Sequence, residues 1–173
     1  MHDKDELPEE LKNIIGSEVE LGWGPDMVCK PTIRYWCEAL EDGNPLYYDE
    51  EFAKDNGYAG VIAPPTMTPV FVRPALWPPQ PEGARIADKI RDFPEVVVQQ
   101  NEWEFHSPIL IGDHLRSVER LVNISPAKKT RLGTGHFVTI QQLYYDQHDR
   151  LVATRTSPRF HYKKDSPRKE QTE

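Results

Sequence analysis

The sequence has little cysteine, no cationic stretch along its main part and no long apolar run. Cys29 and Cys37 are the only cysteines, and no histidine or second cysteine pair stands close enough to complete a familiar zinc site. Acidic residues outnumber basic ones 28 to 21, the opposite of a nucleic-acid-binding balance. No apolar segment approaches the roughly 18 residues that cross a bilayer, and residues 1–10 are charged where a signal peptide is apolar. We therefore expect a cytoplasmic protein with no metal, nucleic-acid or membrane partner and with two buried thiols.

The residues that are present are typical of one globular domain. Hydrophobic residues make up 38% of the chain and charged residues 28%, and 4 Trp, 7 Tyr and 6 Phe are spread along it. Such a composition supports a packed core, and 173 residues suit a single domain. We expect this domain to span residues 1–165, and residues 166–173 to form a flexible polar tail or linker.

The spacing of apolar residues predicts helices first and strands second. Helical spacing indicates helices over residues 7–15, 32–40 and 48–56, the second with Thr32 as its N-cap and Gly43 as its stop signal. Alternating or extended patterns indicate strands over residues 18–21, 95–106, 114–124, 134–146 and 151–162. Because the strands follow the helices and do not alternate with them, we expect an α+β fold with an antiparallel sheet.

Three segments share the pattern of one known family. They are D-G-N-P-L-Y at residues 42–47, G-Y-A-G-V-I-A-P-P-T-M at residues 57–67, and W-E-F-H-S-P at residues 103–108, which runs on to Gly112-Asp113. Asp-Gly-Asn-Pro is by itself an ordinary turn, but a turn does not account for the other two segments in register. Together the three resemble the MaoC-like (R)-specific enoyl-CoA hydratases, in particular their fatty-synthase-like dehydratase branch, over roughly residues 16–162.

The resemblance implies a fold, a reaction and a set of site residues. The fold is a hot dog, in which an antiparallel sheet wraps around a central helix, and the reaction is the addition of water to a trans-2-enoyl-CoA thioester. The aspartate and histidine of the family's D-x-N-P-L-H motif hold the water, which places Asp42 and Tyr47 at the catalytic positions. The resemblance also implies five substrate-binding residues: Asn44, Gly60, Ala63, Thr66 and Met67. No cofactor is expected, because coenzyme A is part of the substrate.

Tyr47 departs from the family pattern, which has histidine at this position. Hydration needs a base to activate water at C3, a proton for C2 and donors for the thioester oxygen. A phenol with an ordinary pKa of about 10 is a poor base at neutral pH, so Tyr47 does not simply replace the histidine, although Asp42 could still orient a water molecule. His106 and His114 fall at or near strand ends and are further candidates for the base.

Prolines interrupt the segment that forms the central helix in the family. Pro69 suits a first helical turn, but Pro74 would break a continuing helix at a cost of roughly 3 kcal/mol. We therefore expect a central helix that is short, kinked or lost. A shorter helix would open the tunnel beneath the sheet and would suit a bulky acyl group such as a steroid side-chain ester, whereas the alternative is an ordinary proline-rich loop over the sheet.

The damaged dyad leaves three functional hypotheses. The first follows from a resemblance to the heteromeric hydratases of actinobacterial steroid and mycolate metabolism, in which one member of each pair lacks the dyad. It makes this chain the non-catalytic half of a double hot dog that needs a catalytic MaoC-like partner. The second is a self-sufficient homodimer or tetramer in which Asp42 acts with Tyr47 or His106. The third is a non-enzymatic acyl-CoA-binding or scaffold module.

Overall fold

One antiparallel sheet carries the fold in the computed structural model, which describes residues 7–75, 77–78, 85–90 and 92–164. Seven strands are present in this part of the chain, with β1, β4, β6, β7 and β2 in that order across the sheet, β3 beside β7 and β5 beside β6. They are β1 Glu18–Trp23, β2 Glu95–Val98, β3 Glu102–Phe105, β4 Arg116–Ile124, β5 Lys128–Thr130, β6 Gly133–Tyr145 and β7 Leu151–Lys163. Residues 166–173, the expected tail, lie outside the described residues.

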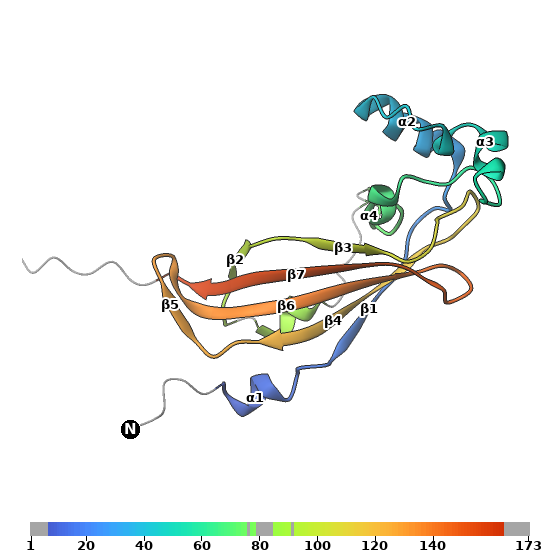
Figure 1. Ribbon diagram of the computed structural model, residues 1–173. Coiled ribbons are helices and arrows are strands. Elements are labelled where there is room, and N and C mark those ends of the chain that lie inside the picture. The colour runs from blue at the N-terminus through green and yellow to red at the C-terminus, as the bar shows by residue number, and fades with distance from the viewer. Residues whose placement is uncertain (1–6, 76, 79–84, 91, 165–173) are drawn as a thin grey trace, which may run out of the picture.

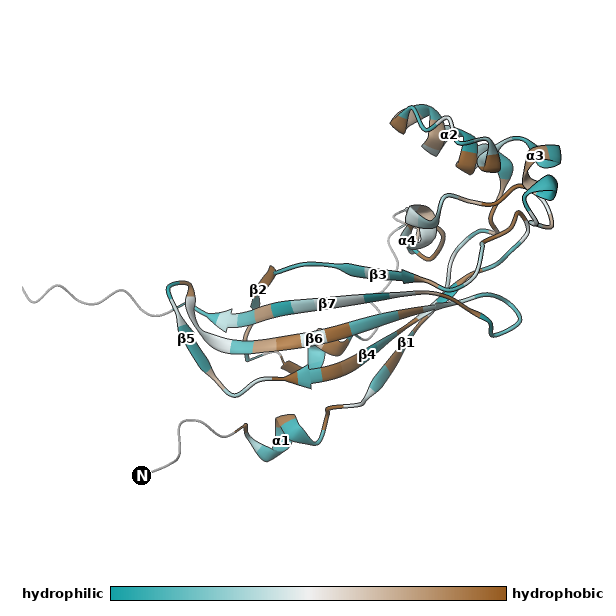
Figure 2. Cartoon of the chain, in the orientation of Figure 1, coloured by the Kyte–Doolittle hydropathy of each residue, from teal (hydrophilic) through white to brown (hydrophobic). Residues whose placement is uncertain are grey.

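Short helices accompany the sheet, and α2, α3 and α4 gather at one end of it (Figure 1). The α-helices are α1 Glu9–Lys12, α2 Lys30–Leu40, α3 Glu50–Asp55 and α4 Thr68–Phe71, and the 3₁₀ helices are η1 Pro45–Tyr47, η2 Pro65–Met67 and η3 Ile86–Ile90. Figure 2 shows hydrophobic residues along one side of α2, and Ile33 of that helix is fully buried. None of the described helices is both long and apolar enough to cross a bilayer.

The predicted helices are present, with corrected ends. The prediction of Thr32 as N-cap is wrong, because α2 begins at Lys30 with Cys29 as its N-cap and Pro31 in its first turn, where the missing proline N–H would have had no helical partner. The helix also ends before Gly43, with Glu41 in the left-handed conformation. Both cysteines are free thiols, but they are half-buried and not buried as expected.

The single strand predicted over residues 95–106 is wrong, because it is two strands, β2 and β3. Pro158 of β7 explains the break. Its carbonyl accepts a hydrogen bond from the Gln99 N–H at 3.0 Å, but proline has no N–H with which to return the second bond of the pair. The ladder resumes only at Glu102, which pairs with Thr156.

The expected shortening of the central helix is confirmed. Pro69 lies in the first turn of α4, which ends at Phe71, three residues before Pro74. Gly24, at the end of β1, lies against the Phe71 carbonyl so closely that a Cβ atom would overlap it. The helix therefore covers only one end of the sheet, as Figure 1 also shows.

Two hydrophobic clusters lie on the covered face of the sheet, which we call the inner face. Tyr144, Ala153 and Leu115 belong to the cluster that packs with α4, and Leu121 and Ile140 belong to the cluster that packs with η3. Register pairs show which residues lie between these clusters, since directly opposed residues share a face. They are Ser117, Glu119, Gln142 and Arg155, which we call the polar band.

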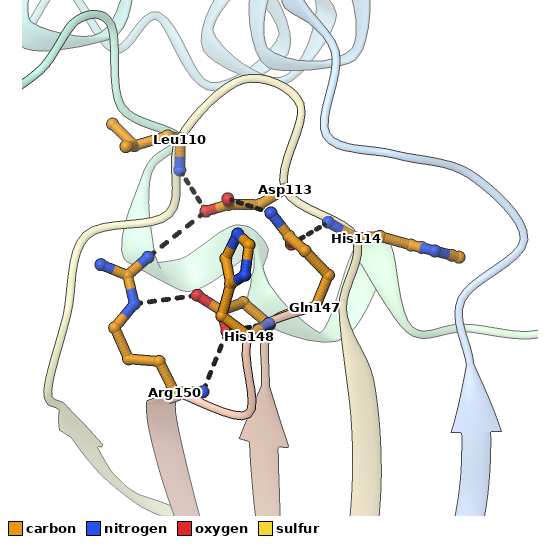
Figure 3. Close-up of polar contacts among 7 residues, drawn as sticks. Leu110, Asp113, His114, Gln147, His148 and Arg150 are labelled. Carbon is orange, nitrogen blue, oxygen red and sulfur yellow. Dashed lines mark hydrogen bonds and ion pairs between the residues drawn. The ribbon is translucent and has the colours of Figure 1, made fainter.

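The loop that precedes β4 joins three parts of the chain. Gly112 N–H donates to the Val28 carbonyl at 2.8 Å and Val28 N–H donates to the Asp113 carbonyl at 2.7 Å, which fixes the residue that precedes α2. The Asp113 carboxylate accepts from the Leu110 N–H at 2.8 Å and from Gln147 Nε2 at 3.3 Å. Figure 3 shows these contacts and the approach of Arg150 to the same carboxylate. The Gly112-Asp113 motif is thus a structural joint.

Asp146 holds the turn between β6 and β7 on which this joint rests. Its fully buried carboxylate accepts from the N–H groups of His148 and Arg150, both at 2.9 Å, and from Arg150 Nε at 2.8 Å. Burial acts to raise the pKa of Asp146, but the hydrogen bonds from Arg150 and His148 and the Arg150 charge outweigh it and hold the pKa below the ordinary value of 3.8.

We predict that Asp146→Asn lowers the free energy of unfolding by about 2–3 kcal/mol at pH 7, because charge-assisted bonds to a buried group are lost. The carboxylate's contribution is fully present above its unfolded pKa and is lost as pH falls through the lower folded pKa. Urea unfolding across pH 2–7 should therefore show wild type and variant converging at the acidic end. Asp149→Asn in the same turn is the control, since the Asp149 side chain is 79% exposed. An equal loss in both variants would contradict the assignment.

Candidate functional site

The turn between α2 and η1 places the two residues at the catalytic positions. Asp42 Oδ1 accepts a 3.2 Å hydrogen bond from the Asn44 N–H, and Asn44 Oδ1 accepts a 3.1 Å bond from the Leu46 N–H, which caps η1. Asp42 N–H donates to the Cys37 carbonyl at 2.9 Å. These local bonds are those of an aspartate and asparagine turn.

Tyr47 is a neutral phenol at physiological pH. Burial raises its pKa above 10.0, and the Asp42 carboxylate raises it further, while a hydrogen bond with Asn44 acts in the opposite direction. Burial and the Asp42 charge also raise the pKa of the neighbouring Cys37 thiol above 9.0. The carboxylate therefore has two weakly acidic neighbours and no imidazole in this position, so the pair cannot transfer a proton as aspartate and histidine do.

Asp42 and Tyr47 line one open pocket with a volume of about 340 Å³. The pocket also contains Cys37 and, from α2, the two cations Lys30 and Arg34. The structure thus brings the two dyad positions together with Gly43 between them, and Asn44 lies directly beside them through its bond to Asp42.

The other four predicted binding residues lie elsewhere. Ala63 and Met67 are buried in the cluster around α4, whereas Gly60 is half-buried and Thr66 is exposed. A bond from the Ile62 N–H to the Leu46 carbonyl, 3.2 Å long, ties their segment to η1. Their roles in binding stay predictions, and none of the four is among the described residues that line the pocket of Asp42.

The candidate replacement bases are engaged in other contacts. His106 Nε2 lies 2.9 Å from Thr154 Oγ1 and 4.0 Å from a Glu104 carboxylate oxygen. His114 Nε2 donates to the Gly24 carbonyl at 2.7 Å, and its ring packs on Trp23 with centroids 5.0 Å apart. Neither imidazole lines the pocket of Asp42. Among the residues that the structure describes, no group of three or more His, Cys, Asp or Glu side chains could hold a metal ion.

A second hollow lies over the polar band, where the sequence predicted no site. It has a volume of about 240 Å³ and lies between the end of α4 and the inner face. Ser117, Gln142, Tyr144 and Arg155 line it from the sheet, and Val72 lines it from beyond α4. The signal in the sequence is the polar Gln142 within the apolar run of β6, but its face becomes known only from the register.

The comparisons with known proteins point to one family. The sequence model of the FAS1-like dehydratase domain region matches residues 13–155. A probable enoyl-CoA hydratase alpha subunit from Thermomonospora curvata is 38% identical over 139 residues, which are 76% of this chain and 44% of that protein. The 3-oxo-4,17-pregnadiene-20-carboxyl-CoA hydratase alpha subunit of Mycobacterium tuberculosis is 31% identical over 133 residues, 74% of this chain and 42% of that protein. The chain thus spans less than half the length of both relatives.

A solved structure agrees with these relatives. A chain of the ChsH1–ChsH2 complex from Mycobacterium tuberculosis superimposes with a TM-score of 0.78 and 26% identity, and the match covers 90% of this chain and 95% of that one. The expected α+β hot-dog fold with a shortened central helix is confirmed.

We predict that Tyr47 ionises only above pH 10, because burial and the Asp42 charge both disfavour the phenolate. The difference in phenolate absorbance between wild type and Tyr47→Phe during a pH titration isolates this one tyrosine. Asp42→Asn should shift the Tyr47 transition to lower pH, because one source of the upward shift is removed. A Tyr47 transition below about pH 9 would show an activated phenol and would overturn the conclusion that Tyr47 keeps its proton at neutral pH.

Proposed function

Because the chain belongs to the FAS1-like dehydratase domain family and is a MaoC-like member of it, we propose that it is the non-catalytic subunit of a heteromeric 2-enoyl-CoA hydratase. The holoenzyme adds water to a trans-2-enoyl-CoA thioester. One observation carries the assignment of the supporting role. The position that needs a base holds Tyr47, whose pKa is raised and not lowered. The base must then come from a partner that has the intact motif.

The partner is a catalytic MaoC-like hot dog that pairs along the edge formed by β2 and β3. Both strands pair only with β7 among the described strands, so their outer backbone groups are available to another sheet. Val96, Val97, Val98 and Phe105 are all more than 40% exposed at this edge, which is an association-prone surface for a free chain. The relatives named alpha subunits and the ChsH1–ChsH2 complex support a heteromeric assembly.

The acyl group is bulky, such as a steroid side-chain ester. The shortened α4 leaves the 240 Å³ hollow over the inner face, a space that a long helix would fill. Small-molecule pockets typically have about 300–1,000 Å³, so the partner's surface completes this chamber. The steroid-CoA substrate in the name of the M. tuberculosis relative supports a polycyclic acyl group.

The subunit assignment predicts hydration only in the presence of the partner. A panel from crotonyl-CoA to a steroid side-chain enoyl-CoA is followed by loss of the conjugated thioester absorbance, first with this chain alone and then with a co-purified MaoC-like partner. We expect activity only with the partner, a preference for the steroid ester, and a kcat that Asp42→Asn changes by less than about twofold. Mutation of the partner's dyad should abolish hydration, since loss of a general base lowers the rate by about 10²–10⁴-fold.

Three results would change this assignment. Activity of the chain alone that is lost in Asp42→Asn would establish the self-sufficient homodimer. Tight acyl-CoA binding without turnover in either preparation would establish the binding module. A preference for crotonyl-CoA would contradict the bulky acyl group while leaving the hydratase assignment intact.

The edge assignment predicts that Val97→Lys weakens association with the partner by at least about tenfold, because a charge at a pairing edge opposes sheet extension. Val122→Lys on β4 is a matched control, since Val97 and Val122 are both 41% exposed. Analytical ultracentrifugation of each variant mixed with the partner measures the strength of association. Equal loss in the two variants, or no loss in either, would place the interface elsewhere.

A further inference from the structure

The floor of the hollow between α4 and the sheet is polar, and its walls combine apolar residues such as Leu21 and Val72 with the cations Arg73 and Arg85. Gln142 Nε2 donates to Ser117 Oγ at 3.3 Å, and the Arg155 guanidinium donates to Gln142 Oε1. These bonds fix the Gln142 amide and hold Arg155 over the inner face. Buried polar groups are costly unless they are bonded. A chamber that binds only hydrocarbon would therefore be lined more favourably by apolar side chains than by this polar row.

Two donors in this hollow have no hydrogen-bond partner among the described residues. They are the hydroxyl of Tyr144 and Nε of Arg155. Tyr144 is completely buried, and burial raises its pKa to about 12, against the opposing effect of Arg155, so it keeps its proton. An unpaired buried donor costs about 1–3 kcal/mol, which a bound acceptor would offset.

The two donors converge from neighbouring strands. Tyr144 pairs with Ala153, and Arg155 pairs with Gln142, so the two side chains are diagonal neighbours on one face. Trp103 stacks on Tyr144 with centroids 5.6 Å apart, and the Arg155 guanidinium lies 5.6 Å from the Trp103 ring centroid. An aromatic surface thus adjoins these two unpartnered donors. This combination suits a rigid ring system with an oxygen substituent.

The charge of the hollow has one sign. Arg73, Arg85 and Arg155 line it, and no carboxylate is among its described lining residues. Glu119, on the polar band, lies 3.7 Å from Arg85 and accepts from the Ile86 N–H at 3.1 Å. This carboxylate offsets the charge of Arg85, so Arg73 and Arg155 supply the positive charge of the hollow. The local field favours an oxygen that carries negative charge or a strong carbonyl dipole.

We propose that this hollow is the far end of the acyl chamber and that Tyr144 Oη and Arg155 Nε bind an oxygen atom, a ketone or a carboxylate, on the distal part of the acyl group. The inference rests on the proposed function and narrows it to oxygenated acyl groups. No covalent step is involved, so Tyr144 and Arg155 act on specificity and not on the chemistry of hydration.

The test combines the co-purified complex with three steroid side-chain enoyl-CoAs that differ only at the ring: one with a ketone, one with a carboxylate and one with neither. KM and kcat are measured for each, together with the dissociation constants of the corresponding saturated, unreactive esters. We expect Tyr144→Phe to weaken binding of the ketone ester about tenfold more than binding of the unsubstituted ester. Arg155→Met should weaken ester binding by about tenfold or more, with the largest effect on the ester whose oxygen the site prefers.

Tyr145→Phe is the matched control, because the adjacent Tyr145 packs on Arg116 at 4.5 Å, outside the hollow. Thermal melting provides a readout without any ligand. Tyr144→Phe should melt at the wild-type temperature or above it, because an unpaired buried hydroxyl is removed. A lower melting temperature would show that the hydroxyl has a partner within the protein and would overturn the proposal.

The kinetic outcomes distinguish failure of the oxygen site from failure of the hydratase function. Equal effects of Tyr144→Phe on all three esters, or equal binding of all three by wild type, would overturn the oxygen site while the hydratase function stands. If the complex neither hydrates nor binds any of the esters, the proposed function fails, and the oxygen site fails with it.

Discussion

Pro74 prevents α4 from continuing over the inner face of the sheet. Its ring would clash with the carbonyl four residues earlier in a continuing helix, and it has no N–H for the helical ladder. The helix α4 accordingly ends at Phe71, and the inner face is covered by two separate hydrophobic clusters with the polar band between them. A chain with a long helix at this place would bury that band under side chains, and Gln142 and Arg155 would be unfavourable there.

Because α4 is short, it contributes few contacts between the helices and the sheet. The Gly112-Asp113 loop contributes further contacts. Backbone bonds fix Val28 before α2, and the isolated bridge between Ile62 and Leu110 together with the Ala63 bond to Ile109 fixes the segment before η2. The Asp146 turn supports the loop from beneath through Arg150. The Gly112-Asp113 loop thus has a mechanical role, because it fixes the segments that precede α2 and η2.

The sequence was sufficient for those features that depend on local chemistry. Pro69 and Pro74 predicted the shortened helix, the family motif over residues 42–47 predicted that Asp42 and Tyr47 share one site, and alternation predicted β6 and β7. Features that depend on pairing were missed. The break between β2 and β3 comes from Pro158 on another strand, and the short β5 forms only because β6 extends beside it.

The second hollow shows the same limit. Arg155 is separated in sequence from Gln142, and only the register of β6 with β7 places Arg155 opposite Gln142 and Tyr144 opposite Ala153. Composition and motifs identify the family and the damaged dyad, because those residues are neighbours along the chain. A site assembled across three strands has no comparable signature in a single sequence, since a shift of one residue would turn every side chain to the other face.

We propose that this chain contributes half of one composite site and no complete site of its own. Isothermal titration of the co-purified complex with a saturated, unreactive steroid side-chain CoA ester tests it by stoichiometry. We expect one ligand for each pair of this chain and its catalytic partner, and no saturable binding of comparable affinity to this chain alone. Two ligands per pair would contradict it, because both hot dogs would then hold a complete site.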